Sequence, residues 1–327
     1  MSIVSCSPSL APASSTLWLL CARLGVGGVI IFPLDSRRVV LTVALSKSGM
    51  ARIARDHDMI IEGPNCLGLI NGVDGIPLTF VLTPARELDA GKGLAVVSQS
   101  GAMAAVLGAS LRSHALRISY SISTGNEATT SVEDFVDYLI DDEHTHVIAM
   151  IVELFRQPRR FLELVHRARR RNKHIVLLHP GTNPARRGRP RRLHTGALAG
   201  NYDVMRTLVA HAGVIIVDSL EELIDVSHIL IRCASVPRGG TVVFTESGAH
   251  KALALWILVT LWACRCRNSR VRRRRHLRRI LPDLCIPPTN PLDITAQPLA
   301  EPELYQRTLP VLLADERFRS IVLATSS

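Results

Sequence analysis

The sequence predicts an α/β protein built from parallel sheets that are covered by helices on both faces. From residue 93 onward, short apolar runs of strand length alternate with longer segments whose apolar residues recur at helical spacing. One sequence motif also occurs twice, at Val96–Ala102 and at Val243–Ala249: an apolar strand, a hydroxyl residue, and then Ser-Gly-Ala at the start of a helix. The alternation is typical of βαβ units, and the repeat predicts two similar α/β domains in series.

Before residue 93 the pattern is weaker, and only a few elements are predicted. They are a strand over 29–32, a helix over 49–58, a strand over 59–61 and a turn rich in Gly, Pro and Asn over 62–68. No regular element is predicted over 2–16 or 69–80, and 83–92 has the composition of a linker.

Beyond residue 93 each element can be assigned from its own period. Strands are predicted over 94–97, 118–122, 147–152, 174–178 and 214–217, and helices over 101–113, 132–140, 158–171, 201–212 and 220–233. A second linker, 236–240, precedes the second copy of the repeated motif. After that copy, 256–279 shows the apolar period of neither a helix nor a strand. A helix is expected near 302–313 and a strand over 320–323, one strand into what we expect to be a longer domain.

Composition limits the classes of function. A net charge of +11 indicates an anionic partner, but the aromatic content is only 4%, which makes nucleic acid unlikely as that partner. The seven cysteines lack the paired spacing of a zinc site, so no metal is expected. Their odd number and the lack of a secretory signal or an apolar run of spanning length predict a cytoplasmic protein without membrane contact.

The loop after the strand 174–178 carries the candidate nucleophile, His194. Open α/β sheets bind ligands at the carboxyl ends of their strands, and His194-Thr195-Gly196 follows such an end. An imidazole among small residues can carry a group covalently. The alternative is an ordinary loop histidine ahead of a helix.

Polar residues at other strand ends complete a candidate site. Ser98 and Ser100 stand at a helix start, where free amides and the helix dipole favour an anion, although a plain N-cap explains them too. Gly125-Asn126-Glu127 ends the next strand and either faces the same space or is an ordinary turn. Glu153 ends the strand after it, where a carboxylate can orient an imidazole or simply remain solvated.

Four motifs, in this order, resemble one known family. They are Gly63–Gly68 (GPNCLG), Ser98–Gly101 (SQSG), Gly125–Glu127 (GNE) and His194–Ala197 (HTGA). Together they look like the succinyl-CoA synthetase α-subunit and its relatives, the NDP-forming acyl-CoA (acetate–CoA) ligases, over roughly residues 48–255 and again from about 280. The resemblance implies an incomplete Rossmann-like CoA-binding domain over 1–85, a flavodoxin-like domain over 93–235 and part of a second one over 239–327.

The resemblance also implies a mechanism. An acyl phosphate gives its phosphoryl group to His194, whose loop then swings to a nucleotide in an ATP-grasp domain, and Glu153 steadies the imidazole. Asn65 and Cys66 would lie near the thiol end of CoA. The phosphate-binding residues would be Ser98, Ser100, Gly101, Gly125, Asn126 and Gly196. The implied partners are CoA, a small carboxylic acid, and a separate ATP-grasp (β-like) subunit or domain that binds ATP or another NTP with Mg²⁺.

Departures from the family pattern keep alternatives open. Residues 33–47, 186–193 and 256–279 lack the pattern while their flanks keep it, and the arginine runs there are what a shifted reading frame in GC-rich DNA would produce. The alternatives to a ligase are a non-catalytic CoA-binding or regulatory relative and a basic nucleic-acid-binding protein. A salt titration with oligonucleotides would test the second.

Overall fold

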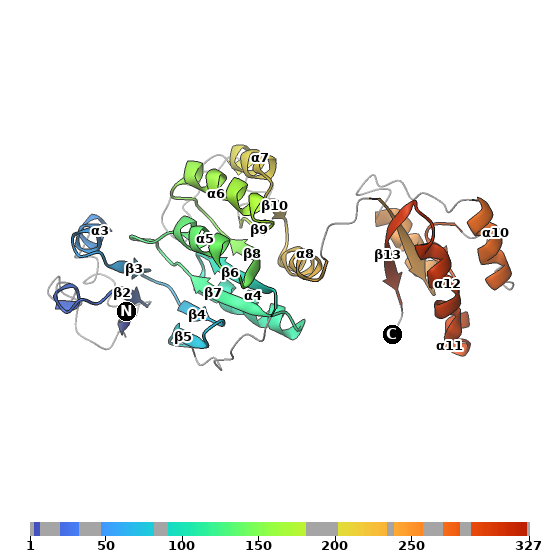
Figure 1. Cartoon of the computed structure of the whole chain (residues 1–327), viewed down its shortest axis with the longest axis horizontal. Helices are drawn as coiled ribbons and strands as arrows, with labels where there is room; N and C mark the ends of the chain where they lie inside the picture. Colours follow the sequence, from blue (N-terminus) through green and yellow to red (C-terminus); the bar gives the residue numbers. More distant parts are fainter. Residues whose placement is uncertain are drawn as a thin grey trace. The chain divides into compact units, whose positions relative to one another are not determined.

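The chain forms two compact units, Met1–Ala234 and Ser235–Ser327. The computed structural model describes residues 3–6, 20–32, 47–81, 91–180, 202–233, 239–257, 271–281 and 289–325 (Figure 1). Each unit contains a sheet whose strands are mainly parallel, as the alternation of strands and helices predicts. The boundary between 1–85 and 93–235 stays a prediction.

The first unit is centred on a seven-stranded sheet. Its strands are β4 (Gly68–Asn71), β5 (Ile76–Thr79), β6 (Gly93–Ser98), β7 (Ile118–Ser123), β8 (Thr145–Ile151), β9 (His174–Leu178) and β10 (Ile215–Val217). Their order across the sheet is β10-β9-β8-β6-β7-β4-β5, and β6 to β10 are parallel. Counted along the chain, the parallel part has the 2-1-3-4-5 order of a flavodoxin-like fold. These five strands begin and end within two residues of their predicted limits.

Helices cover both faces of this sheet. They are α4 (Gly101–Ser113), α5 (Val132–Asp141), α6 (Pro158–Arg170), α7 (Tyr202–Ala212) and α8 (Leu220–Arg232). One buried cluster joins the sheet to α5, α6 and α7, with Phe161 fully buried, and a second joins it to α4 and α8 through residues such as Leu107 and Leu223. Burial on both faces explains why the strands read as continuous apolar runs.

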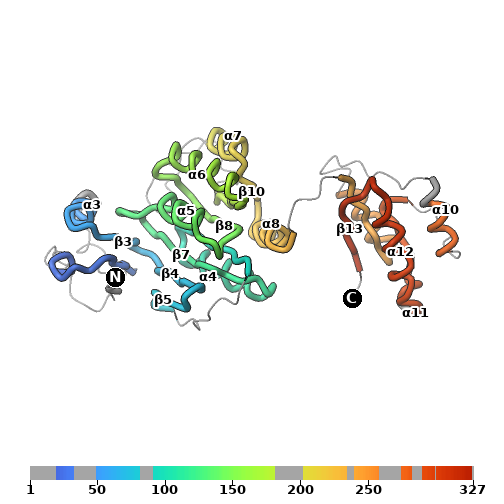
Figure 2. Tube along the Cα trace, in the orientation of Figure 1, coloured from blue at the N-terminus to red at the C-terminus, as the bar shows by residue number. Residues whose placement is uncertain are grey.

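The prediction of an irregular segment over 69–80 is wrong. β4 and β5 form a hairpin that extends the sheet beside β7, antiparallel to it, so the sheet is mixed rather than wholly parallel (Figure 2). The turn between the strands is held by Asn71, whose Oδ1 accepts the amides of Val73 and Asp74 at 2.9 and 3.1 Å. Four-residue strands are too short to show a period, which is why the sequence did not reveal them.

A separate three-stranded parallel sheet precedes this hairpin. Its strands are β1 (Ile3–Cys6), β2 (Gly28–Ile31) and β3 (Ile60–Glu62), in the order β1-β2-β3, and α3 (Lys47–Asp56) precedes β3. The predicted strand at 29–32 and helix at 49–58 correspond to β2 and α3. The prediction that 2–16 has no regular element is wrong for 3–6, where the backbone pairs with β2.

The second unit has a three-stranded parallel sheet of order β12-β11-β13. Its elements are β11 (Gly240–Thr245), α9 (Gly248–Leu255), α10 (Val271–Ile280), β12 (Leu292–Asp293), α11 (Gln297–Ala300), α12 (Glu303–Leu313) and β13 (Phe318–Ala324). The absence of a predicted element over 256–279 is wrong for α10. Arginine favours helix, and Leu277 and Leu281 anchor this one in the core.

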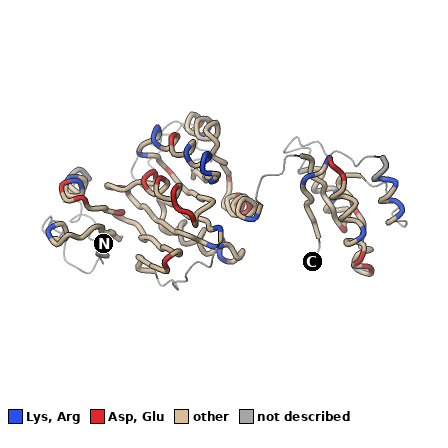
Figure 3. Tube along the Cα trace, viewed as in Figure 1, with Lys and Arg blue, Asp and Glu red and all other residues tan. Residues whose placement is uncertain are grey.

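The charge distribution is uneven. Basic residues line α10, where Arg275, Arg278 and Arg279 are exposed, and acidic residues of α5 face the arginines of α6 (Figure 3). Among the residues that the structure describes, no helix combines the length and apolar character needed to cross a bilayer.

Candidate functional site

The candidate site lies where β6 and β8 run side by side and their carboxyl ends meet. From β6 the chain passes to β7 on one side, and β8 lies on the other, so this is the switch point of the sheet order. Ligands of open α/β sheets bind in the crevice outside such a point. Ser98 pairs with Ile151 in the register, which places the Ser98–Gly101 turn beside the residues that follow β8.

The Ser98–Gly101 turn opens α4. The Ser98 hydroxyl is fully buried; it accepts the Ser100 amide at 3.0 Å and donates to the Ser100 carbonyl at 2.9 Å. Ser100 is the N-cap, and its Oγ accepts the Met103 amide at 3.4 Å. A Cβ on Gly101 would lie 2.6 Å from Leu67 Cγ, so glycine is required for this contact. Ser98 therefore shapes the turn, and the helix start at Ser100 and Gly101 is the part that can meet an anion.

The 63–68 loop and the 125–127 loop lock together. The Asn126 and Ala128 amides donate to the carbonyls of Pro64 and Gly63, each at 2.8 Å. Gly125 has φ +60°, and a Cβ there would lie 2.5 Å from Pro64 O. The structure thus brings together loops that are 60 residues apart in the sequence, next to the Ser98–Gly101 turn.

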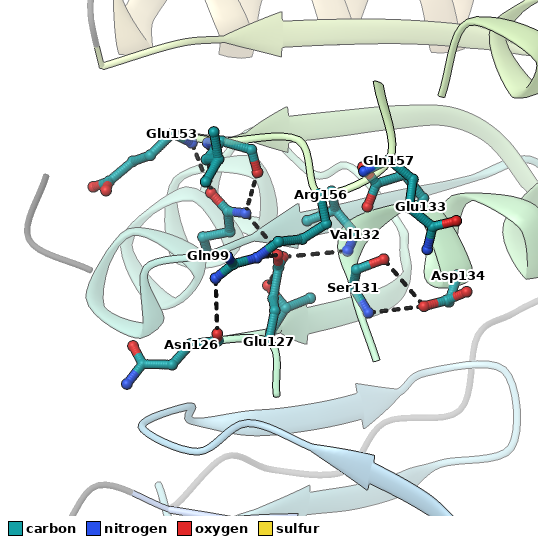
Figure 4. A network of polar contacts seen from close by, with 12 residues as sticks. Gln99, Asn126, Glu127, Ser131, Val132, Glu133, Asp134, Glu153, Arg156 and Gln157 are labelled. Carbon is teal, nitrogen blue, oxygen red and sulfur yellow. Dashed lines mark hydrogen bonds and ion pairs between the residues drawn. The ribbon is translucent and has the colours of Figure 1, made fainter. Parts of the chain in front are cut away.

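Glu153 follows β8 at the same edge. Its Oε2 is buried and has no hydrogen-bond partner in the described part of the chain. Figure 4 shows its carboxylate turned away from the neighbouring Gln99 amide. The backbone is held from the β9 side, since His179 Nε2 donates to the Glu153 carbonyl at 3.0 Å. A buried carboxylate oxygen without a donor is costly, so this atom is suited to receive an imidazole N–H.

Asn65 and Cys66 differ in their exposure. Asn65 is exposed, with φ +63°, and its Nδ2 lies 3.5 Å from Asn126 Oδ1. Cys66 is buried, and its thiol donates to the Ile31 carbonyl at 3.4 Å. Asn65 can therefore contact a ligand at this edge, whereas Cys66 holds the loop onto β2.

Two predicted site residues, His194 and Gly196, lie outside the described residues, as do the arginines at 186–192. The nearest described residues flank that segment at the carboxyl end of β9 and the start of α7, where the His179 and Tyr202 rings lie 5.1 Å apart. No group of three or more His, Cys, Asp or Glu side chains in the described ranges is arranged to hold a metal ion.

Comparison with known proteins identifies the family of the central domain. Residues 90–230 match the model of the succinyl-CoA ligase like flavodoxin domain. A trans-feruloyl-CoA synthase from an unknown prokaryotic organism is 44% identical over 307 residues, which are 92% of this chain and 42% of that protein. The α subunit of an ADP-forming acetate–CoA ligase II from Pyrococcus furiosus is 26% identical over 90% of this chain and 62% of its own length.

The chain contains a succinyl-CoA ligase like flavodoxin domain, and along most of its length it is similar to a CoA synthase and to ADP-forming acyl-CoA ligases. It spans about 42% to 62% of the length of these two curated relatives. A solved structure, a dinucleotide-forming acetyl-coenzyme A synthetase 1 from Ca. Korarchaeum cryptofilum in complex with phosphate and ADP, has the same fold. Its TM-score is 0.80 at 21% identity, covering 99% of this chain and 68% of that one.

In this acyl-CoA synthetase relative, sequence reasoning missed the residues that connect the motifs. The buried Gln99 and Glu127 and the partly exposed side chain of Arg156 form a network across the ends of β6, β7 and β8 (Figure 4). The available signal was a pair of polar residues in the loops that follow two strands: Gln99 directly after β6, and Glu127 four residues after the end of β7. Such residues are buried only when they are hydrogen-bonded, so their place in the pattern could have suggested a network.

The environment of Cys66 predicts low thiol reactivity. Burial, with a smaller contribution from the neighbouring Glu62 carboxyl, raises the pKa of Cys66 to about 12. Relative to a thiol with the ordinary value of 9.0, this makes the thiolate fraction about a thousandfold smaller. We therefore expect iodoacetamide at pH 8 to alkylate the exposed Cys233 and to leave Cys66 unmodified in the native protein. Peptide mass spectrometry checks this. Both thiols should react in guanidinium chloride, and equal native rates would contradict the burial of Cys66.

Proposed function

We propose that this chain is the α-like portion of an NDP-forming acyl-CoA ligase and that His194 carries the phosphoryl group. The observation that supports this most is the buried Oε2 of Glu153, which has no hydrogen-bond partner among the described residues and lies at the sheet's switch point, beside the helix start at Ser100 and Gly101. A carboxylate acceptor and an anion-binding helix start are what a transient phosphohistidine requires.

In the proposed step, one ring nitrogen of neutral His194 attacks the phosphorus of an acyl phosphate. The P–N bond forms, the bond between phosphorus and the acyl oxygen breaks, and the acid leaves as its carboxylate. The other ring nitrogen keeps its proton, which Glu153 accepts as a hydrogen bond, and this stabilises the positive charge on the phosphorylated ring. The start of α4 at Gly101 lies at the positive end of the helix dipole, which favours the phosphoryl oxygens.

CoA supplies the thiol that exchanges with phosphate at the acyl carbon. Asn65 fits a role in holding it, because its exposed amide lies at the edge where the three loops meet. Gly125 and Asn126 shape this edge through their contacts with the 63–68 loop. Nucleotide, with Mg²⁺, would be bound by an ATP-grasp partner subunit or domain, to which the phosphorylated His194 loop would move.

Incubation of the full chain with a small acyl phosphate tests the assignment without a partner. Acetyl phosphate or feruloyl phosphate should place one acid-labile, base-stable phosphate on the chain, detected by ³¹P NMR and mass spectrometry. His194→Ala should abolish it, whereas His211→Ala, which changes an exposed histidine of α7, should not. Label that persists in His194→Ala would refute the assignment. A chain that accepts no phosphate from either donor would favour the non-catalytic relative.

A further inference from the structure

The side chain of Gln99 uses its full hydrogen-bonding capacity between two parts of the site. Its Oε1 accepts the amides of Glu153 and Leu154 at 2.8 and 3.1 Å. Its Nε2 donates to the Leu154 carbonyl at 2.6 Å and to Glu127 Oε1 at 2.9 Å. The residue is 8% exposed, so water cannot readily replace these bonds.

Glu127 determines which way round the Gln99 amide lies. Its side chain is fully buried; Oε1 also accepts from Thr124 Oγ1 at 2.9 Å and from the Val132 amide at 3.2 Å. Its Oε2 pairs with Arg156 Nε at 3.3 Å. Burial raises the pKa of Glu127, and the bonds from Gln99 and Thr124 oppose that rise. Because each of these neighbours donates, the carboxyl group is an acceptor here, and Gln99 must turn its Nε2 toward it.

We propose that Gln99 is a positioning residue, which fixes the backbone at Glu153 so that the Glu153 carboxylate meets the imidazole of His194. The inference rests on the proposed function. Three anchors hold the Glu153–Leu154 turn: Gln99 Oε1 and Nε2 from the β6 side, and His179 on the Glu153 carbonyl from the β9 side. Figure 4 shows the result, with the Glu153 backbone bound to Gln99 and its carboxylate directed away.

An isosteric substitution of Gln99 should make the rate of His194 phosphorylation depend on pH in a way that wild type does not. In wild type, Gln99 Nε2 lies 2.9 Å from Glu127 Oε1 and 2.6 Å from the Leu154 carbonyl oxygen. In Gln99→Glu an oxygen replaces Nε2 and faces these two acceptors. The charged groups beside this pair are Arg156 and Glu133 from α5, whereas the Glu153 carboxylate is directed away from it. Two adjacent carboxylates bind a shared proton, so acidification restores a donor at this position.

The test uses the full chain with acetyl phosphate or feruloyl phosphate as phosphoryl donor, between pH 6 and 8. We expect Gln99→Glu and Gln99→Met to slow phosphorylation of His194 by about 10- to 100-fold at pH 8, since small misplacements of a catalytic group cost this much. Acidification should restore the rate in Gln99→Glu relative to wild type, and not in Gln99→Met. Amide exchange at Glu153 and Leu154, followed by NMR, should be faster than wild type in Gln99→Met.

Thr124→Val is the matched control. It removes one hydrogen bond to the same Glu127 oxygen and leaves the Glu153–Leu154 turn untouched, so phosphorylation and its pH profile should stay as in wild type. A wild-type rate in Gln99→Met, an equal loss in Thr124→Val, or a wild-type pH profile in Gln99→Glu would overturn the proposal. If wild type itself forms no phosphohistidine, the proposed function has failed. Unchanged exchange at 153 and 154 in Gln99→Met would then refute the anchoring separately.

Discussion

We expect Gly125→Ala to lower the free energy of unfolding of the first compact unit by about 2–5 kcal/mol. Gly125 has φ +60°, a left-handed conformation that costs other residues about 1–2 kcal/mol. A Cβ would also lie 2.5 Å from Pro64 O and 2.6 Å from Asn65 O. Both are backbone atoms of a loop bonded to this one, so relief requires the two loops to separate. Hydrogen exchange of the β6 and β8 amides reports the loss.

Gly108→Ala is the control for this prediction. Gly108 lies inside α4, and a Cβ there would be 3.5 Å from Arg112 Nη2, an ordinary contact. Alanine should therefore stabilise the helix by about 0.5–1 kcal/mol. If both substitutions changed stability alike, the interlock of the two loops would not be a source of stability.

The parts of the fold that the sequence predicted are the elements long enough to show a clear pattern of apolar residues. The strand at 174–178 coincides with β9, and the helix at 132–140 differs from α5 by one residue, because a buried strand or an amphipathic helix of ten residues leaves a clear pattern. The hairpin at 68–79 left none, since its strands have four residues each. In α10 the helical signal came from arginine, whose contribution is propensity rather than periodicity.

The site was predictable as a set of loops but not as a set of contacts. Strand ends could be read from the sequence, so Ser100, Gly125 and Glu153 were expected at one edge. Which loops touch depends on the strand order, and the sequence does not state it. The placement of β6 between β7 and β8 brings Gln99 within reach of both Glu127 and Glu153. The burial of Cys66 and Ser98, both expected to face a ligand, likewise follows from packing between loops.

The buried carboxyl of Glu62 should make stability fall as the pH rises. Glu62 is 2% exposed, ends β3, and has an Oε1 without a hydrogen-bond partner among the described residues. Burial raises its pKa from 4.5 to about 8. Between these values the unfolded chain releases the proton and the native state keeps it, so the free energy of unfolding falls by about 1.4 kcal/mol per pH unit. Above pH 8 the native state carries a buried charge for which the described residues offer Oε1 no hydrogen-bond partner.

Glu62→Gln isolates this effect, because the amide has nearly the same shape and never ionises. Near pH 5 the variant and wild type should unfold with similar free energies, since the native carboxyl is neutral there. At pH 9 the variant should be more stable, by about 3–5 kcal/mol. Denaturant titrations of both proteins at several pH values, followed by exchange of the β2 and β3 amides, give the two curves. Curves that stay parallel from pH 5 to 9 would show that Glu62 is already ionised and paired in the native protein. Glu62→Gln should also affect Cys66, because the Glu62 carboxyl contributes to the raised pKa of that thiol. If the two groups are neighbours as described, the Cys66 thiol should react faster above pH 8 in Glu62→Gln than in wild type.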